Sequence, residues 1–275
     1  MTLQHQFLAI DEGRQRLHLI DTRDPAAGWS RNLADFPLAR DLQRIGPDRA
    51  LVGFERGFFE LAISTGEVLR VCDRWLGVTA ACRLDNGDTL VTGMDLDFGR
   101  NGINVLTLDR DLVQTASARR EGDYVRLMRP AGASYLLCTN DHILETDHSL
   151  NEVRKLAAPG FEHAWKAQRM AGGGTLVSAG YGAFMARFDA QGRLASTFGG
   201  AAQLPAAVRD DVAPFFYATF QVLDNGHVVV ANWQGHGPDN GAKGRQLLEF
   251  DAAGTLLGSW SDSDKLSSLQ GILVL

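Results

Sequence analysis

Short apolar runs alternate with turn residues along the whole chain. Runs of about 4–8 mostly apolar residues between glycine-rich turns predict β-strands, and an Asp-Asn-Gly turn, as at 85–87 and 224–226, predicts a hairpin. The best helix candidate is 205–212, inside a long connector at 199–215. The pattern therefore predicts an almost entirely β chain. Two groups of four strands are clearest, at 164–170, 175–179, 184–189 and 194–198, and at 217–223, 228–232, 246–251 and 256–260.

Two short motifs recur, which indicates an internal repeat. The first is a Gln, any residue and a bulky aliphatic residue; it begins at Gln43, Gln168, Gln221 and Gln270, with degenerate copies at Cys82 and Arg126. The second ends an apolar strand with a carboxylate or hydroxyl, at Asp21, Ser64, Asp109, Asp147, Asp189 and Asp251. Asp and Ser suit a strand end because their oxygens accept N–H groups in the following turn.

The spacing of the two motifs predicts a closed ring. The first motif precedes the second by 21 residues in three units, which run from 43 to 64, from 126 to 147 and from 168 to 189. Gln270 finds its partner motif only at Asp21, so the C-terminus begins a unit that the N-terminus completes. Repeats of about 40–50 residues with four strands each are typical of propeller blades.

We therefore predict an all-β, six-bladed β-propeller with four-stranded blades, whose last blade is closed by N- and C-terminal strands. Residues 1–275 form a single domain in this interpretation. Closure by both chain ends leaves fewer exposed strand edges. The repeating glutamines, with Arg126, are expected to bond between neighbouring blades; the alternative is that they line the channel. The predicted blades are about 37–72, 77–118, 123–157, 162–198, 216–261, and 266–275 plus 5–34.

One rim of this ring collects the longest loops. Strand direction alternates within a blade, so loops between second and third strands share a face with the connectors between blades. The insertions at 95–101 and 233–243 and the connector at 199–215 all meet that face, and loops on a rigid scaffold are where function concentrates. The candidate binding residues on or near this rim are Asp95, Asp97, Arg100, Asn140, His142, His163, Trp165, Tyr181, Tyr217, Asn232, Trp233, His236 and Asp239.

Aromatic side chains beside amides and carboxylates suit stacking on, and hydrogen bonding to, a sugar or another polar small molecule. A polar small-molecule or glycan ligand is therefore the first hypothesis. A metal-assisted hydrolase or lyase at the channel mouth and a protein–protein interaction platform are the alternatives. Ca²⁺ would use Asp95, Asp97, Asp141 and Asp239; Zn²⁺ would use His142, His163 and His236. No G-x-S-x-G nucleophile motif is present, so the sequence does not decide whether the protein is an enzyme.

Composition and charge narrow the partners. The net charge of −6 and the absence of a basic run argue against nucleic acid. No segment approaches the roughly 20 apolar residues of a membrane helix, and the N-terminus lacks the features of a secretory signal. We expect a cytoplasmic protein with three reduced thiols, because Cys72, Cys82 and Cys138 form no CxxC motif.

One unit carries a family resemblance. The chain reads Q-V-L-D-N-G-H-V-V-V-A-N-W from Gln221 and L-L-E-F-D-A-A-G-T-L-L-G-S-W up to Trp260. A hydrophobic-Asp-x-x-Gly turn followed by a strand ending in Trp resembles blades of the quinoprotein-like and arylsulfotransferase-like propellers. The resemblance implies a scaffold and carries over no catalytic residue. WD-type and kelch signatures are missing, as is the Glu-Gly-Pro opening of gluconolactonase-type lactonases.

Overall fold

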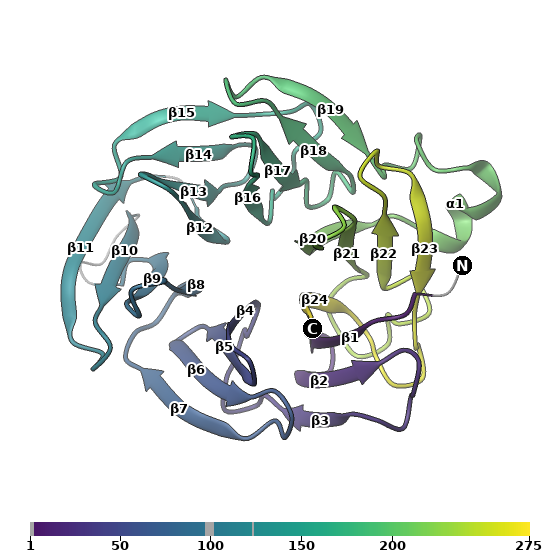
Figure 1. Ribbon diagram of the computed structural model, residues 1–275, viewed down its shortest axis with the longest axis horizontal. Coiled ribbons are helices and arrows are strands. Elements are labelled where there is room, and N and C mark those ends of the chain that lie inside the picture. The colour runs from purple at the N-terminus through teal and green to yellow at the C-terminus, as the bar shows by residue number, and fades with distance from the viewer. Residues whose placement is uncertain (1–2, 97–101, 123) are drawn as a thin grey trace.

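The computed structural model describes residues 3–96, 102–122 and 124–275. Within these residues, 24 strands form six four-stranded sheets that stand as blades around a central channel (Figure 1). All strand pairs inside a blade are antiparallel. The predicted six-bladed propeller is confirmed.

The blades are numbered here in chain order, and their strands are given from the channel outward. Blade 1 consists of β24 (Leu269–Val274), β1 (Gln6–Asp11), β2 (Arg16–Asp21) and β3 (Trp29–Asn32). Blade 2 consists of β4 (Asp41–Gly46), β5 (Arg49–Phe54), β6 (Gly57–Ala62) and β7 (Val68–Asp73). Blade 3 consists of β8 (Val78–Arg83), β9 (Thr89–Met94), β10 (Gly102–Leu108) and β11 (Gln114–Glu121).

The other half of the ring follows the same plan. Blade 4 consists of β12 (Met128–Ala131), β13 (Ser134–Cys138), β14 (Ile143–Thr146) and β15 (Glu152–Leu156). Blade 5 consists of β16 (Ala167–Arg169), β17 (Thr175–Ser178), β18 (Met185–Phe188) and β19 (Leu194–Phe198). Blade 6 consists of β20 (Phe216–Val222), β21 (Val228–Trp233), β22 (Leu247–Phe250) and β23 (Leu256–Trp260). The helix α1 (Ala206–Val212) lies in the connector between blades 5 and 6, where the sequence predicts it.

Burial explains why the middle strands read as continuous apolar runs. In blade 2, β5 and β6 are buried on both faces because the blade packs between two neighbours. The outermost strand β7 is mostly exposed. The same gradient from channel to rim holds in blade 5, where β17 is buried and β19 is largely exposed.

The two chain ends close the ring in blade 1. Strand β24 pairs with β1 from Phe7–Val274 to Asp11–Leu269. The buried carboxylate of Asp11 accepts hydrogen bonds from the backbone N–H groups of Ser267 (2.8 Å) and Ser268 (3.0 Å), at the point where the C-terminal segment enters the sheet. The predicted closure by N- and C-terminal strands is confirmed.

Glutamine side chains join neighbouring blades at two of the predicted positions. Gln43 donates to the carbonyl oxygen of Arg83 (2.9 Å) and accepts from its N–H (2.6 Å). Gln221 makes the same pair of bonds to Val274 across the closing interface, at 3.1 and 2.8 Å. The inter-blade role is therefore confirmed for these two glutamines.

The predicted register of this ring is wrong in blade 4. In blade 2, Gln43 pairs with Leu51, which pairs in turn with Glu60. In blade 4, Arg129 pairs with Leu136, which pairs in turn with Glu145. Arg129 therefore occupies the position that Gln43 holds in blade 2. Arg126 lies three residues earlier in the chain, nearer the end of the channel at which the innermost strands begin. The repeated motif does not reveal this register, because β12 contains a proline and its apolar and polar residues alternate only weakly.

Arg129 extends into the channel and forms an ion pair with Asp41 of blade 2, passing blade 3. Asp41 is 1% exposed and also accepts from the N–H of Ala81 in blade 3. Burial, the first influence on Arg129, lowers its pKa, but the adjacent Asp41 carboxylate outweighs it and holds the pKa above the usual value. Three successive blades thus meet at one carboxylate.

No helix in the described part of the chain is long and apolar enough to cross a membrane.

We expect Asp11→Ala to lower the free energy of unfolding by about 1–3 kcal/mol, because it leaves two buried N–H groups unpaired at the closure. Urea denaturation followed by tryptophan fluorescence measures this. Asp24→Ala is the matched control, since Asp24 accepts a single N–H in an exposed turn. Equal effects of the two substitutions would show that the closure does not depend on Asp11.

Candidate functional site

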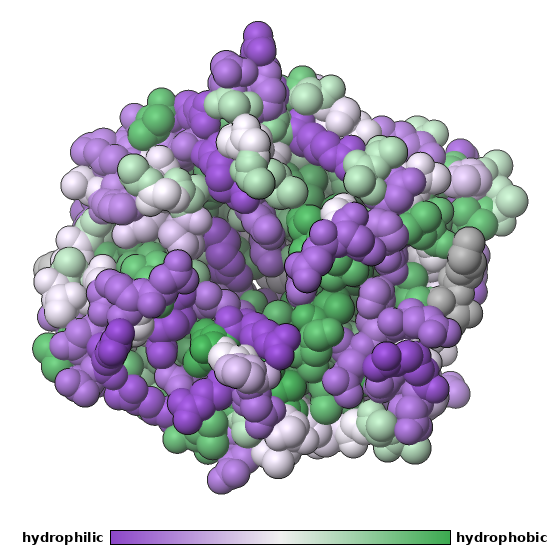
Figure 2. Space-filling view, in the orientation of Figure 1, coloured by the Kyte–Doolittle hydropathy of each residue, from purple (hydrophilic) through white to green (hydrophobic). Residues whose placement is uncertain are grey.

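A cavity of about 540 Å³ opens at one mouth of the channel. Its walls come from loops between second and third strands, from connectors between blades, and from the first residues of innermost strands. Blades 1, 2, 4, 5 and 6 contribute; of the three long segments predicted to share one rim, 233–243 lines the cavity through Trp233 and His236, while no described residue of 95–101 or 199–215 does. The space-filling view down the same axis as Figure 1 shows one face hollowed at its centre, with hydrophobic residues beside the hollow near blades 6 and 1 (Figure 2). The lining residues are Glu12, Leu38, Arg40, Tyr124, Arg126, Asn140, His163, Trp165, Tyr181, Phe216, Trp233, His236 and Gln270.

One side of the cavity is cationic. Arg126, just before β12, is 7% exposed; it donates to the Asn140 side-chain oxygen (2.8 Å) and lies 5.1 Å from the centre of the Tyr124 ring. Among the described residues it has no carboxylate partner. Burial lowers the pKa of Arg126, because a guanidinium surrounded by protein loses hydration. A buried cation without an anion is unusual and points to a missing partner.

The opposite side is aromatic. Phe216 stands at the centre, with its ring 4.7 Å from Tyr181, 5.3 Å from Trp233 and 5.4 Å from Trp165. All three contacts are edge-to-face, which is a favourable geometry for aromatic rings. Phe216 and Trp233 are 3% exposed, Trp165 is 6% exposed, and Tyr181 is 36% exposed. The packed rings form a rigid wall whose accessible member is Tyr181.

Glu12 fixes one end of this wall. Its carboxylate accepts from the indole N–H of Trp233 (3.2 Å) and lies 2.9 Å from Nδ1 of His236. Because β24 is the innermost strand of blade 1, β1 and β2 are its second and third strands. The β1–β2 loop, which contains Glu12, is therefore a loop between the second and third strands of its blade. Sequence reasoning overlooked Glu12, although that circular count contained the signal needed to find it.

Six of the predicted site residues line the cavity. His163 has a left-handed backbone (φ 58°), so its side chain leaves a strained connector rather than a strand. Burial, with a smaller effect from nearby Arg126, lowers the pKa of His163. The imidazole is therefore held toward its neutral form. The six residues are Asn140, His163, Trp165, Tyr181, Trp233 and His236.

The remaining predicted residues lie elsewhere. Tyr217 is fully buried and donates to the carbonyl oxygen of Gly199 (2.6 Å), and Asn232 is fully buried with its amide bonded to three carbonyl oxygens around α1 and β22. Both hold the long connector in place. Asp95 accepts the N–H of Gly102 within its turn.

His142 and Asp239 do not line the cavity either. His142 is mostly buried and bonds to its neighbour Asp141 (2.6 Å), while Asp239 is exposed beside the β21–β22 loop. Asp97 and Arg100 lie outside the described residues. No group of three or more His, Cys, Asp or Glu side chains in the described residues is arranged to hold a metal ion. Neither the calcium set nor the zinc set is thus brought together within that part of the chain.

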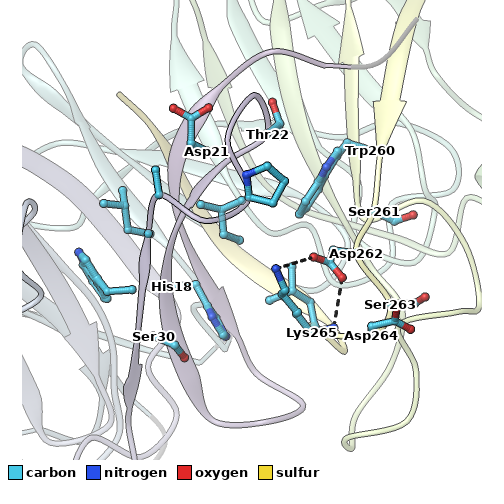
Figure 3. Close-up of a pocket in the computed structure, with 17 residues that line it drawn as sticks. His18, Asp21, Thr22, Ser30, Trp260, Ser261, Asp262, Ser263, Asp264 and Lys265 are labelled. Atoms are coloured by element: carbon cyan, nitrogen blue, oxygen red, sulfur yellow. Dashed lines mark hydrogen bonds and ion pairs between the residues drawn. The ribbon is translucent and has the colours of Figure 1, made fainter.

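A second cavity, of about 480 Å³, lies between blades 6 and 1 on the outer side of the ring (Figure 3). Two of its carboxylates already have partners: Asp262 pairs with Lys265 (3.8 Å), and Asp21 pairs with Arg23 (2.7 Å). Asp264 forms no ion pair with a described residue but is exposed to solvent, so no buried unpaired carboxylate occurs among the described residues of this cavity, and it is a weaker candidate than the channel mouth. Its most unusual group is His18, which is 8% exposed and whose Nε2 has no partner among the described residues.

Comparisons with known proteins identify the fold. No protein-family model matches the chain, and no curated protein matches it in sequence. A structure of a protein of unknown function from Bacteroides caccae is similar over 99% of both chains, with a TM-score of 0.79 and 17% identity.

Two named propellers are also similar. Streptogramin B lyase matches with a TM-score of 0.58 and 12% identity over 94% of this chain and 80% of its own. The WD40 propeller domain of Doa1 matches with a TM-score of 0.57 and 11% identity over 84% of this chain and 71% of its own. At such low identity these likenesses establish a β-propeller and nothing finer. The quinoprotein-like resemblance stays a prediction.

His18 makes stability depend on pH. Burial, the largest influence, lowers the pKa of His18 from 6.5 to about 4. The unfolded chain therefore takes up a proton near pH 6.5 that the folded chain accepts only near pH 4, so stability present above 6.5 is lost as the pH falls through this window. Between about pH 7.5 and about pH 5, we expect this group alone to cost about 1–2 kcal/mol of unfolding free energy.

Urea denaturation of His18→Gln across that range checks this expectation, because the variant should lose less stability than the parent. His148→Gln, at an exposed turn position, is the control and should keep the parent's pH dependence. Identical pH dependence of His18→Gln and the parent would contradict the assignment.

Proposed function

We propose that this propeller binds a small polar molecule with a ring and an acidic group at the cavity that Arg126, Tyr181 and Trp233 line. An acidic sugar, such as a hexuronic acid, is the ligand class that fits. The proposal rests above all on Arg126, a buried guanidinium that has no carboxylate partner among the described residues. A bound carboxylate would supply the missing charge in a bidentate geometry that suits a guanidinium.

The aromatic wall supports the ring-bearing part of the proposal. Tyr181 presents the exposed face of a packed cluster, and Trp233 behind it is held by its bond to Glu12. A ring that stacks on a rigid aromatic surface loses little conformational entropy from the protein side. Asn140 and Glu12 offer an amide and a carboxylate for the hydroxyl groups of a sugar. Arg126 and the aromatic residues line one cavity, so a single ligand would contact both.

The alternative of a hydrolase or lyase at this mouth depends on His163. Its lowered pKa leaves the imidazole available to accept a proton at neutral pH. The metal-assisted form of this alternative has less support, since no metal-binding group occurs among the described residues. One structural neighbour is a lyase. Conversion of a bound uronic acid that stops in His163→Gln would favour this alternative over simple binding.

The interaction-platform alternative rests on apolar side chains at the rim. Leu38 is 52% exposed and Phe215 is 45% exposed, and Phe215 lies beside Tyr181 (ring centres 5.7 Å apart). Single exposed apolar residues are common on protein surfaces, so this pair carries less weight than the buried Arg126. If a protein partner bound here, replacing Leu38 or Phe215 would weaken its binding more than replacing Arg126 would.

Binding is measured by titrating the fluorescence of Trp165 and Trp233 with glucuronate and with glucose. We expect glucuronate to bind more tightly, because only it offers a carboxylate to Arg126. Arg126→Gln should weaken glucuronate binding by about 10–100-fold, as expected for loss of a charge-assisted hydrogen bond of about 1.5–3 kcal/mol. Tyr181→Ala should weaken the binding of both sugars.

Arg44→Gln is the matched control, since Arg44 is exposed at the end of β4 and bonds only to nearby carbonyl oxygens. It should bind glucuronate like the parent. Equal affinity of the parent and Arg126→Gln for glucuronate, or no response to either sugar, would overturn the proposed ligand class.

A further inference from the structure

The opposite mouth of the channel contains a separate cavity of about 430 Å³. It lies at the level where the inner strands β8, β12 and β16 end. Four of its lining residues are cationic and one, Asp85, is anionic; two glutamines and Cys82 also line it. The cationic residues are Arg83, Arg129, Lys166 and Arg169.

The three arginines differ from the lysine in their partners. Arg83 pairs with Glu60 (2.6 Å), Arg169 pairs with Glu145 (2.6 Å), and Arg129 pairs with Asp41. Lys166 has no carboxylate partner among the described residues; its Nζ donates to the carbonyl oxygen of Phe220 (2.7 Å). That bond fixes the position of the amine of Lys166, a residue that lines the cavity.

The surroundings of Lys166 favour an uncharged amine. Burial is the main cause, and the nearby guanidinium of Arg129 adds to it; together they lower the pKa of Lys166 to about 7. Asp41, Cys82 and Cys138 act in the other direction but do not cancel these effects. A primary amine that is partly neutral at physiological pH is a nucleophile toward carbonyl groups.

We propose that Lys166 is a carbonyl-reactive amine in a second ligand site, which takes a small 2-oxo acid from this mouth of the channel. The lysine nitrogen attacks the carbonyl carbon to give a carbinolamine, which loses one water molecule and leaves a C=N bond between Lys166 and the ligand. No oxidant or reductant takes part. Arg169 and Arg83, at the cavity wall, hold the carboxylate of the ligand.

Reductive trapping tests this directly. The protein is treated with glyoxylate and cyanoborohydride at about pH 7.5, and the modified lysines are identified by peptide mass spectrometry. The chain contains four lysines, and Lys155, Lys243 and Lys265 are exposed, so they serve as controls inside the same molecule. We expect Lys166 to be modified at least about tenfold faster than the others, because a far larger fraction of it is unprotonated. Labelling of Lys166 at or below the rate of the exposed lysines would overturn the proposal.

Two variants separate the amine from its anion-binding neighbours. Lys166→Arg keeps the positive charge and should abolish the adduct on that peptide. Arg169→Gln should slow labelling by glyoxylate at least about threefold while leaving labelling by neutral acetaldehyde unchanged, since only glyoxylate carries a carboxylate. Glu145 keeps its bond to Arg154 in this variant, so its charge stays paired.

Equal slowing of both aldehydes in Arg169→Gln would contradict recognition of an anionic ligand at this site. The trapping experiment measures an adduct on Lys166 and uses no sugar, so its outcome is independent of the sugar-binding proposal.

Discussion

The pairing of β24 with β1 is the interaction on which the rest of the molecule depends. Each blade buries its faces only against its two neighbours, so an open ring would expose the apolar surfaces of blades 1 and 6. Phe7 and Ile272 from blade 1 share one buried cluster with Phe216 and Val229 from blade 6. Asp11 and Gln221 add directed hydrogen bonds to that contact. Closure also brings Glu12 to the indole N–H of Trp233, so this bond at one end of the cavity wall forms only in the closed ring.

Each mouth of the channel has one buried basic side chain that pairs with no carboxylate among the described residues. Most buried charges here are matched. Three glutamates at one position of the third strand in alternate blades each hold an arginine or histidine partner from the next blade; they are Glu60, Glu145 and Glu249. Arg126 and Lys166 depart from this rule, one at each mouth. Desolvating a cation without an anion costs free energy. A bound carboxylate would offset that cost at Arg126, whereas at Lys166 burial lowers the pKa to about 7, so that this amine is partly uncharged.

The sequence predicts the ring far better than the site. Strand positions and the circular closure follow from local alternation and from the spacing of Gln43, Gln221 and the strand-end carboxylates, because these features repeat. The short helix α1 also lies where the sequence predicts it. The blade 4 register fails where the repeat degenerates, so Arg126 was assigned to the glutamine ring instead of the cavity. Tyr217 and Asn232 look like rim residues in sequence, but their side chains face the connector. Which way a side chain points from a strand end depends on local backbone geometry that no residue pattern encodes.

The ion pair of Arg129 with Asp41 joins blades that are not neighbours, and Ala81 of the intervening blade bonds to the same carboxylate. This ion pair spans blade 3 and links blades 2 and 4 directly. Blades 2 and 4 cannot move apart without breaking a desolvated ion pair, so blades 2, 3 and 4 should move as one rigid segment.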